Sequence, residues 1–414
     1  MVYILNKDNR PLMPTMRHGK VRRLLKSGKA KVVKRCPFTV KLLYETGNEV
    51  QEVVLGIDAG SKVIGVSAST ETMELYAAEV MLRNDIVELL STRREFRRAR
   101  RYRKTRYRKA RFLNRVKSKN KGWLAPSVEN KIGTHIATVK NVMKILPVSK
   151  VVVETASFDI QKIKNPGICG AEYRQGDQLG FWNVREYVLF RDGHKCQCCK
   201  GKSKDKVLNV HHIESRKTGG DAPNNLVTLC EYCHTQYHKG QIALPKGIKR
   251  GASYKDAAFM GIMRWSFYER LKNKLNIPVR MTYGYITKNT RITNDLPKAH
   301  RVDALCIAGH PTAKRLDHYY LQKKVRCHNR QLHKATINKG GYRKNNQAPR
   351  YVFGFQLFDK VMFRGEECFV FGRRASGSFD IRKLDGEKLS EGTSYKNLRL
   401  LEKRKSCLVE RRTA

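Results

Sequence analysis

Two sets of residues with the chemistry to bind metal ions and move protons are interleaved along this chain. The outer set consists of Asp58, Glu154, His300 and Asp303. The inner set lies between Glu154 and His300 and consists of Cys196, Cys199, His211, His212, Cys230, Cys233, His234 and His238. Converging carboxylates can hold two Mg²⁺ ions, one activating water and one stabilising a leaving oxygen. A neutral imidazole can take a proton from water near pH 7. Both sets therefore indicate metal-dependent hydrolysis of a phosphodiester.

The outer set requires elements that are far apart in the sequence. Asp58 ends an apolar strand that is followed by a turn of small residues and a second strand, and Glu154 ends the strand-like run KVVVE. His300 and Asp303 are three residues apart, so a helix over residues 299–309 places them on one face. Each residue alone would be an ordinary polar group at the end of an element. The gap from Glu154 to His300 is too long for one crossover helix, which predicts an insertion there.

The inner set contains two Cys-x-x-Cys pairs. Thiolates at this spacing bind a tetrahedral Zn²⁺ ion, so we expect Cys196, Cys199, Cys230 and Cys233 to form a structural Cys₄ site. The gap between the pairs exceeds the usual zinc-ribbon spacing, and a catalytic hairpin would fill it. Cys198 lies between two ligands and is an alternative ligand. A zinc site without catalysis also remains an alternative.

The charge of the chain predicts a polyanionic partner. There are 85 Lys and Arg residues against 36 Asp and Glu residues, a net charge of +49, for which nucleic acid is the default partner. Residues 93–119 contain fifteen Lys and Arg residues and one acid. This segment is either a disordered basic tail or a helix laid along a phosphate backbone. The arginines expected to contact nucleic acid are Arg93, Arg94, Arg97, Arg98, Arg100, Arg101, Arg103, Arg106, Arg108 and Arg111.

Two further features bear on the cellular compartment. The sequence has no charged-then-apolar signal segment and no run of about 18 apolar residues. We therefore expect no membrane partner and a cytoplasmic protein. The eleven cysteines then indicate metal ligands or core thiols instead of disulfides.

The inner set resembles the HNH, or ββα-metal, nucleases. The resemblance rests on His211-His212, Gly219-Gly220, Asn225-Leu226 and His234…His238 in this order. It implies that His212 is the general base for water and that His211 and His234 bind a single Mg²⁺, with His238 as a further candidate ligand. It also implies that Asn225 braces the loop.

The chain as a whole resembles the IscB family of transposon-encoded, omega-RNA-guided DNA endonucleases, regarded as ancestors of the type II CRISPR effectors. The resemblance rests on Pro11-Leu12-Met13-Pro14, on the outer set as a split RuvC motif, on the basic segment TRYRKARFLNR and on the position of the HNH insertion. It implies an α/β multidomain fold: an RNase H-like (RuvC) mixed sheet, an inserted ββα-metal HNH domain, an arginine-rich bridge helix, a small N-terminal α+β PLMP module and a small C-terminal β module.

The resemblance also implies boundaries and partners. The expected segments are the PLMP domain (1–50), RuvC part I (51–90), the bridge helix (91–119), RuvC part II (120–172), the HNH domain (173–249), RuvC part III (250–312), a basic RNA-contacting linker (313–350) and a β domain reading a flanking motif (351–414). The expected partners are a guide (omega) RNA and double-stranded DNA, in a monomeric ribonucleoprotein. The HNH site would cut the guide-paired strand and the RuvC site, with two Mg²⁺ ions, the displaced one.

Two other classes of protein remain as alternatives. A protein-only endonuclease of the homing or restriction type would explain the inner set and the charge, but it would not need a long basic helix beside a second nuclease. A catalytically silent nucleic-acid-binding protein would explain the charge alone. The presence of Asp58, Glu154, Asp303 and His212 argues against the silent protein.

Overall fold

A computed structural model of the chain describes residues 1–102, 122–155, 169–170, 172, 178–215, 220–249, 251, 254–326, 340 and 349–414. The chain divides into two compact units. Unit 1 comprises Met1–Ser157 and Phe259–Ala414, and unit 2 comprises Phe158–Ala258. The sequence predicts a shorter insertion, residues 173–249. Among the described residues, no helix is both long and apolar enough to cross a membrane.

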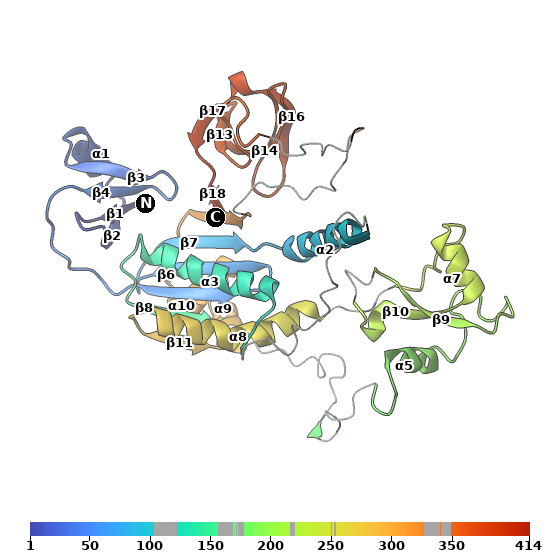
Figure 1. The fold of residues 1–414 in the computed structure, drawn as a ribbon. Helices are drawn as coiled ribbons and strands as arrows, with labels where there is room; N and C mark the ends of the chain where they lie inside the picture. Colours follow the sequence, from blue (N-terminus) through green and yellow to red (C-terminus); the bar gives the residue numbers. More distant parts are fainter. Residues whose placement is uncertain are drawn as a thin grey trace. The chain divides into compact units, whose positions relative to one another are not determined.

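The centre of unit 1 is a seven-stranded mixed sheet in the order β11-β8-β5-β6-β7-β12-β18 (Figure 1). Its strands are β5 (Val54–Ala59), β6 (Val63–Ser69), β7 (Glu74–Met81), β8 (Lys150–Glu154), β11 (Val279–Thr282), β12 (His318–Lys324) and β18 (Cys407–Thr413). Strands β5, β6 and β7 form an antiparallel meander, and β8 and β11 continue the sheet in parallel on the other side of β5. The carboxyl ends of β5 and β8 therefore lie at the same edge.

Helices cover both faces of this sheet. Side chains alternate between faces along a strand, and Leu55 and Ile57 pack in a core with apolar residues of α3 (Pro126–Met143) and α8 (Lys255–Lys274). Val54 packs instead with Ile307 of α10 (His300–Ala308), so α10 covers the opposite face.

Two glycines allow α10 to lie directly on the strands. A Cβ atom on Gly56 would come within 2.0 Å of the Ala304 carbonyl oxygen. A Cβ atom on Gly65 would come within 1.9 Å of the His300 carbonyl oxygen. Any larger residue at either position would push the helix away from the sheet.

The first 50 residues contain a four-stranded sheet in the order β2-β1-β4-β3 and one helix. The elements are β1 (Val2–Leu5), β2 (Pro11–Thr15), α1 (His18–Lys26), β3 (Ala30–Lys34) and β4 (Thr39–Leu42). The Pro-Leu-Met-Pro segment is part of strand β2. Proline lacks a backbone N–H and is tolerated there because β2 is an edge strand.

Unit 2 contains a ββα arrangement. Strands β9 (Leu208–His212) and β10 (Leu226–Cys230) form an antiparallel pair, and α7 (Glu231–His238) follows β10 directly. Helix α5 (Val184–Arg191) precedes the pair, and the short helix η2 (Pro223–Asn225) leads into β10. The small core of this unit contains Val227 and Leu229 together with the cysteines.

The C-terminal region corrects two expected boundaries. Residues 313–350 were expected to be a linker, but His318–Lys324 form β12, inside the central sheet. The segment is basic, yet Tyr320 and Leu321 are buried and Gln322 donates a hydrogen bond to the Tyr76 hydroxyl at 2.5 Å. The module expected over 351–414 ends earlier, because Cys407–Thr413 form β18, which pairs with β12.

Between β12 and β18 lies a five-stranded antiparallel sheet in the order β16-β15-β14-β13-β17. Its strands are β13 (Lys360–Phe363), β14 (Glu366–Arg373), β15 (Ser378–Arg382), β16 (Lys388–Ser394) and β17 (Arg399–Glu402), with the short helix η3 (Tyr395–Asn397) before β17. Val361, Cys368 and Phe379 lie in its own apolar core.

Candidate nuclease sites

The outer set comes together at the edge of the central sheet. Asp58, Glu154 and Asp303 line one pocket of about 290 Å³. Asp58 is in phase with Val54 along β5, and Glu154 is in phase with Val152 along β8. Both carboxylates therefore lie on the face that α10 covers, and Asp303 joins them from the first turn of α10.

His300 lies beside Asp58. Its Nδ1 atom is 2.6 Å from the Asp58 Oδ2 atom, and its side chain is partly exposed. This hydrogen bond raises the pKa of His300 above its usual value. The residue is held over β6 because Gly65 leaves room for its backbone.

The electrostatics of the pocket suit a divalent cation. Burial raises the pKa of Glu154 and the pKa of Asp303, and the nearby Asp58 carboxylate raises both further. Arg291 of α9 (Gly284–Thr293) lies with its Nε atom 3.0 Å from the Asp303 Oδ1 atom. Clustered carboxylates that destabilise one another's charge are typical ligands of a hard cation such as Mg²⁺. The residues present fit the expected metal.

Two residues of α3 hold the turn that follows Asp58, and the sequence did not single out either. Lys131 donates a hydrogen bond from Nζ to the Ser61 carbonyl oxygen at 2.8 Å. The buried His135 ring lies with Nε2 3.2 Å from the Gly60 carbonyl oxygen and Nδ1 2.8 Å from the Lys131 carbonyl oxygen. Burial lowers the pKa of His135 to about 4. Their only sequence signal is a place on a periodic helix.

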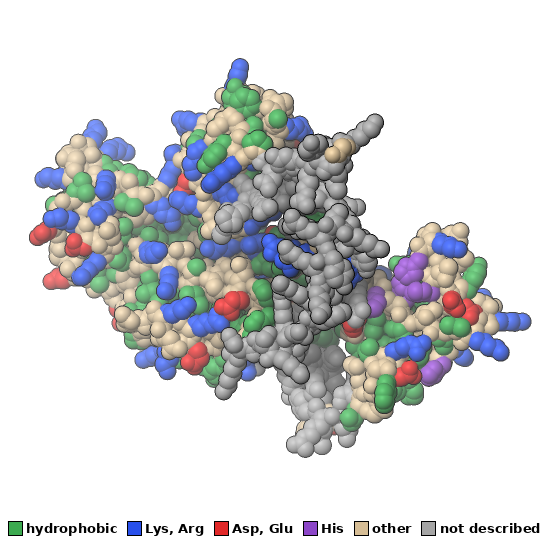
Figure 2. Space-filling view, in the orientation of Figure 1, with side chains coloured by type: hydrophobic (Ala, Val, Ile, Leu, Met, Phe, Trp, Pro, Cys, Tyr) green, Lys and Arg blue, Asp and Glu red, His purple; other side chains and the backbone are tan. Residues whose placement is uncertain are grey.

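The inner set contains a histidine cluster. His211 comes from β9, and His234 and His238 come from one face of α7. One ring nitrogen of each lies within 4.8 Å of the others. Figure 2 shows histidine side chains gathered at the surface of unit 2, in the region where Figure 1 labels α7.

The surroundings of His211 and His234 favour their neutral forms. Burial, and then the neighbouring histidines, lower the pKa of His211 to about 4, and the pKa of His234 is also lowered. The Nε2 atom of His211 is buried without a hydrogen-bond partner among the described residues. The Nε2 atoms of His234 and His238 lie 3.2 Å apart. Three imidazoles with ring nitrogens this close together fit a divalent metal ion.

His212 points away from the cluster because neighbouring residues on a strand face opposite sides. Its Nε2 atom lies 2.9 Å from the Asp221 Oδ1 atom. The sequence analysis did not name Asp221. The signal that could have found it is an acidic residue nine positions after His212, the candidate general base.

Asn225 is buried at the start of β10 and bonds across the loop between the two strands. Its Oδ1 atom accepts a hydrogen bond from the Glu214 amide at 2.9 Å, and its Nδ2 atom donates to the carbonyl oxygens of Glu214 and Gly220. These three contacts tie together two parts of the loop that carries Asp221.

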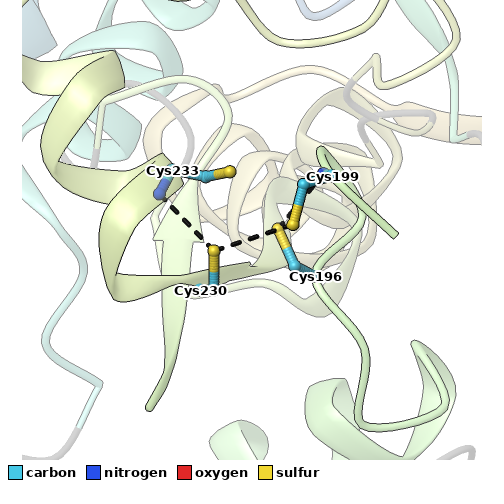
Figure 3. Close-up of side chains that lie close together, drawn as sticks. All are labelled: Cys196, Cys199, Cys230 and Cys233. Atoms are coloured by element: carbon cyan, nitrogen blue, oxygen red, sulfur yellow. Dashed lines mark hydrogen bonds between the residues drawn. The ribbon is translucent and has the colours of Figure 1, made fainter. Parts of the chain in front are cut away.

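The four expected cysteines lie together (Figure 3). Their sulfur atoms are within 4.8 Å of one another, and the Sγ atoms of Cys199 and Cys230 are 3.8 Å apart. The amides of Cys199 and Cys233 each point at the sulfur of the first cysteine of their pair, at 3.5 Å. Such turns present two thiolates to one tetrahedral ion, so the cluster fits Zn²⁺. Cys198 is not part of this group of four.

The basic segment is described only in part. Arg93, Arg94, Arg97 and Arg98 are exposed on α2 (Ile86–Tyr102), and Arg100 and Arg101 fall at its end. Arg103, Arg106, Arg108 and Arg111 lie outside the described residues, as does most of the segment 327–348.

Two parts of the chain match known sequence families. A family described as RRXRR protein matches residues 2–176, and a family described as HNH endonuclease matches residues 196–240. These two matches, in this order, support an IscB/Cas9-like HNH endonuclease. Over 62 residues the chain is 38% identical to anaredoxin of Nostoc sp. (strain PCC 7120), a stretch that covers 15% of this chain and 79% of anaredoxin.

Solved structures of Streptococcus thermophilus Cas9 are also similar to the chain. The complex with AGGA PAM is 14% identical with a TM-score of 0.30, covering 45% of this chain and 26% of the Cas9 chain. The complex with GGAA PAM is 13% identical with a TM-score of 0.32, covering 52% and 30%. The chain thus corresponds to less than a third of these Cas9 chains, and likeness at this level supports no conclusion about its chemistry.

Proposed function

We propose that this protein is an RNA-guided endonuclease that cuts both strands of double-stranded DNA. The observation that carries the proposal is the presence of two separate sets of metal-binding groups. Asp58, Glu154 and Asp303 line a pocket in unit 1, and His211, His234 and His238 cluster in unit 2. Two independent sites match the two strands of a duplex.

The carboxylate pocket is proposed as a RuvC-type site on an RNase H-like sheet. An antiparallel meander of three strands, extended by two parallel strands beside its first strand, supports this assignment. Asp58, Glu154 and Asp303 would hold two Mg²⁺ ions, which supply an activated water and stabilise the leaving oxygen. His300, hydrogen-bonded to Asp58, is positioned to exchange a proton with the attacking water.

The histidine cluster is proposed as the HNH site. His211, His234 and His238 would hold one Mg²⁺, which stabilises the leaving 3′-oxygen. A carboxylate only accepts hydrogen bonds when it is ionised, so Asp221 keeps the ring hydrogen of His212 on Nε2. The Nδ1 lone pair of His212 is then available to take a proton from water. Asn225 holds the loop on which Asp221 lies.

The Cys₄ cluster is proposed as a structural Zn²⁺ site. Unit 2 has a small apolar core, and small domains commonly need a metal to fold. Cys196 and Cys199 join the segment after α5 to Cys230 and Cys233 at the junction of β10 and α7. The ion would thus fix the start of the helix that carries His234 and His238.

Guide RNA is proposed as the partner that supplies sequence specificity. The net charge of +49 and the exposed arginines of α2 support a tightly bound polyanion, and base pairing can deliver specificity that the protein lacks. The bridge-helix role of residues 91–119, the flanking-motif role of the C-terminal β sheet and a cytoplasmic, monomeric ribonucleoprotein belong to the same proposal.

RNA dependence tests this function most directly. The protein is purified from cells carrying its native locus, through high-salt washing, and the copurified nucleic acid is sequenced. We expect an RNA of discrete length, and double-strand breaks only at DNA that matches part of it. Site-specific cutting by protein freed of RNA would overturn guidance and favour a protein-only endonuclease of the homing type.

A further inference from the structure

Two exposed tyrosines flank the glycine that lines the carboxylate pocket. Tyr283 is 51% exposed and Tyr285 is 66% exposed, on either side of Gly284. Their ring centroids are 6.1 Å apart and their planes differ by 10°, so the rings are stacked side by side. Aromatic rings usually bury most of their area, and a parallel pair open to solvent at the rim of a site is suited to contact a ligand.

The backbone fixes these rings at the rim of the pocket. Strand β11 ends at Thr282, which pairs with Glu154 of β8. Tyr283 then caps α9, where its carbonyl oxygen accepts hydrogen bonds from the Ile286 and Thr287 amides at 3.0 and 3.3 Å. A Cβ atom at Gly284 would lie 3.0 Å from the Glu154 Oε1 atom. The two rings are therefore carried by the turn that packs directly against a proposed metal ligand.

Cations surround the same pocket. Lys288 and Arg291 follow Tyr285 on α9, and Lys298 lines the pocket from the segment before α10. Positive side chains bind a phosphate backbone, and aromatic rings stack on bases. Proteins that bind single-stranded nucleic acid combine these two kinds of contact.

We infer that Tyr283 and Tyr285 form a stacking platform for unpaired DNA bases beside the phosphate held at the carboxylate pocket. This inference rests on the proposed function, in which a DNA strand enters that pocket. In a duplex each base is already covered by its neighbours, so the platform favours a strand that has been separated from its partner. The contact tolerates any sequence because every base has a π-face.

Photo-crosslinking of the full chain tests the platform without requiring cleavage. A single-stranded oligonucleotide containing 5-iododeoxyuridine is irradiated with the protein in EDTA, and crosslinked peptides are identified by mass spectrometry. The wild type should crosslink at Tyr283 or Tyr285. The double variant Tyr283→Leu/Tyr285→Leu should lose about fivefold or more of this yield, and Tyr283→Phe/Tyr285→Phe should retain it because the rings remain. The same sequence as a duplex should crosslink poorly.

A matched control separates stacking from general attraction to a basic protein. Tyr232 of α7 is 58% exposed and lies in unit 2, so Tyr232→Leu should leave the crosslinks at residues 283 and 285 unchanged. The stacking inference is wrong if these two residues crosslink no better than Tyr232. It is also wrong if the phenylalanine and leucine double variants give the same crosslinking yield.

A different measurement tests the proposed nuclease activity. If the wild type makes no Mg²⁺-dependent nick in the displaced strand but crosslinks at the platform as expected, the pocket binds single-stranded DNA and the cleavage proposal alone is overturned. If nicking occurs and the platform crosslinks are absent, only the stacking inference is overturned.

Discussion

The two candidate sites are assembled in opposite ways. The histidine cluster, with His212, Asp221 and Asn225, comes from one short ββα segment, residues 208–238. The carboxylate pocket takes Asp58, Glu154 and Asp303 from two strands and a helix spread over unit 1. A local site depends on loops, turns and its own metal, whereas the non-local site depends on the packing of a whole sheet. The two sites should therefore fail independently.

Burial affects the two sites in opposite electrostatic directions. It raises the pKa of Glu154 and Asp303 and lowers the pKa of His211 and His234. In each case burial favours the uncharged form of the group. Burial therefore disfavours the anionic form in which these carboxylates bind a cation, and it favours the neutral form in which these histidines bind a metal ion.

The largest expected effect comes from removing one chemical group at each site. His212→Ala should leave an enzyme that nicks only the displaced strand, and Asp58→Ala should leave one that nicks only the guide-paired strand. Each should lose its own cut by about 100-fold or more, because His212 is the proposed general base and Asp58 is a proposed metal ligand. Strand-specific end labelling of a matched target measures both cuts. Double-strand breaks by either variant would show that the roles assigned to these residues are wrong.

Loss of the zinc site should inactivate the local site and spare the other. Cys230→Ser should reduce the zinc content from about one ion per chain and abolish cutting of the guide-paired strand. Nicking of the displaced strand should survive, because Cys230 belongs to unit 2. Elemental analysis and strand-specific nicking check both effects.

The matched control for the zinc experiment is Cys198→Ser, since Cys198 lies outside the group of four. It should keep both the zinc and the cutting. Protein purified without chelators that contains no zinc would contradict the assignment of the cluster.

A smaller effect is expected from the turn that follows Asp58. Lys131→Met keeps the length of the side chain but removes its hydrogen bond to the Ser61 carbonyl oxygen. We expect nicking of the displaced strand to fall about tenfold, since a small displacement of a catalytic group is costly. Cutting of the guide-paired strand should not change. An equal loss at both strands would indicate a general defect and would contradict a positioning role.

The last expected effect concerns stability instead of cutting, and it is a pH dependence of the stability of unit 1. Burial lowers the pKa of His135 to about 4, against an ordinary value of 6.5. Protonation therefore favours the unfolded chain, so the stabilisation is complete above pH 6.5 and is lost as the pH falls toward 4. Between pH 7 and pH 5 the loss should be about 2 kcal/mol. In thermal unfolding scans, His135→Gln should reduce the difference in stability between pH 7 and pH 5. An unchanged difference would contradict the assignment of this pH dependence to His135.

Sequence reasoning named residues that lie together in both sets, and it missed other contacts that arise from tertiary packing. The spacing of Cys196, Cys199, Cys230 and Cys233 predicted a cluster that lies together, because two turns and a hairpin determine it. His135 was visible only as a residue of a periodic helix, since its contact with Gly60 spans 75 positions.

The central sheet was also incompletely predicted. Strand β12 looked like a linker because it lies in a basic segment and contains polar residues, although Tyr320, Leu321 and Gln322 are buried. Its partners, β7 and β18, are each distant in the sequence, and local propensity carries no information about such pairs. The close approach of α10 to Gly56 and Gly65 is likewise readable only after the sheet is formed.

Strands β12 and β18 pair as a hairpin, and the five-stranded C-terminal sheet is inserted between them. The Val325 amide donates a hydrogen bond to the Ser406 carbonyl oxygen at 3.0 Å, so the chain leaves and re-enters the central sheet at one place. A unit attached in this way can be exchanged while the strand pairing of the central sheet is kept. The replacement must cover Leu321 and Leu408, because both pack against Phe369 and Leu384 of the present unit. Truncating the chain after residue 350 would instead remove β18. Strand β12 would then be an unpaired edge strand, which favours aggregation. Modular replacement, in evolution or in the laboratory, is therefore easier here than truncation.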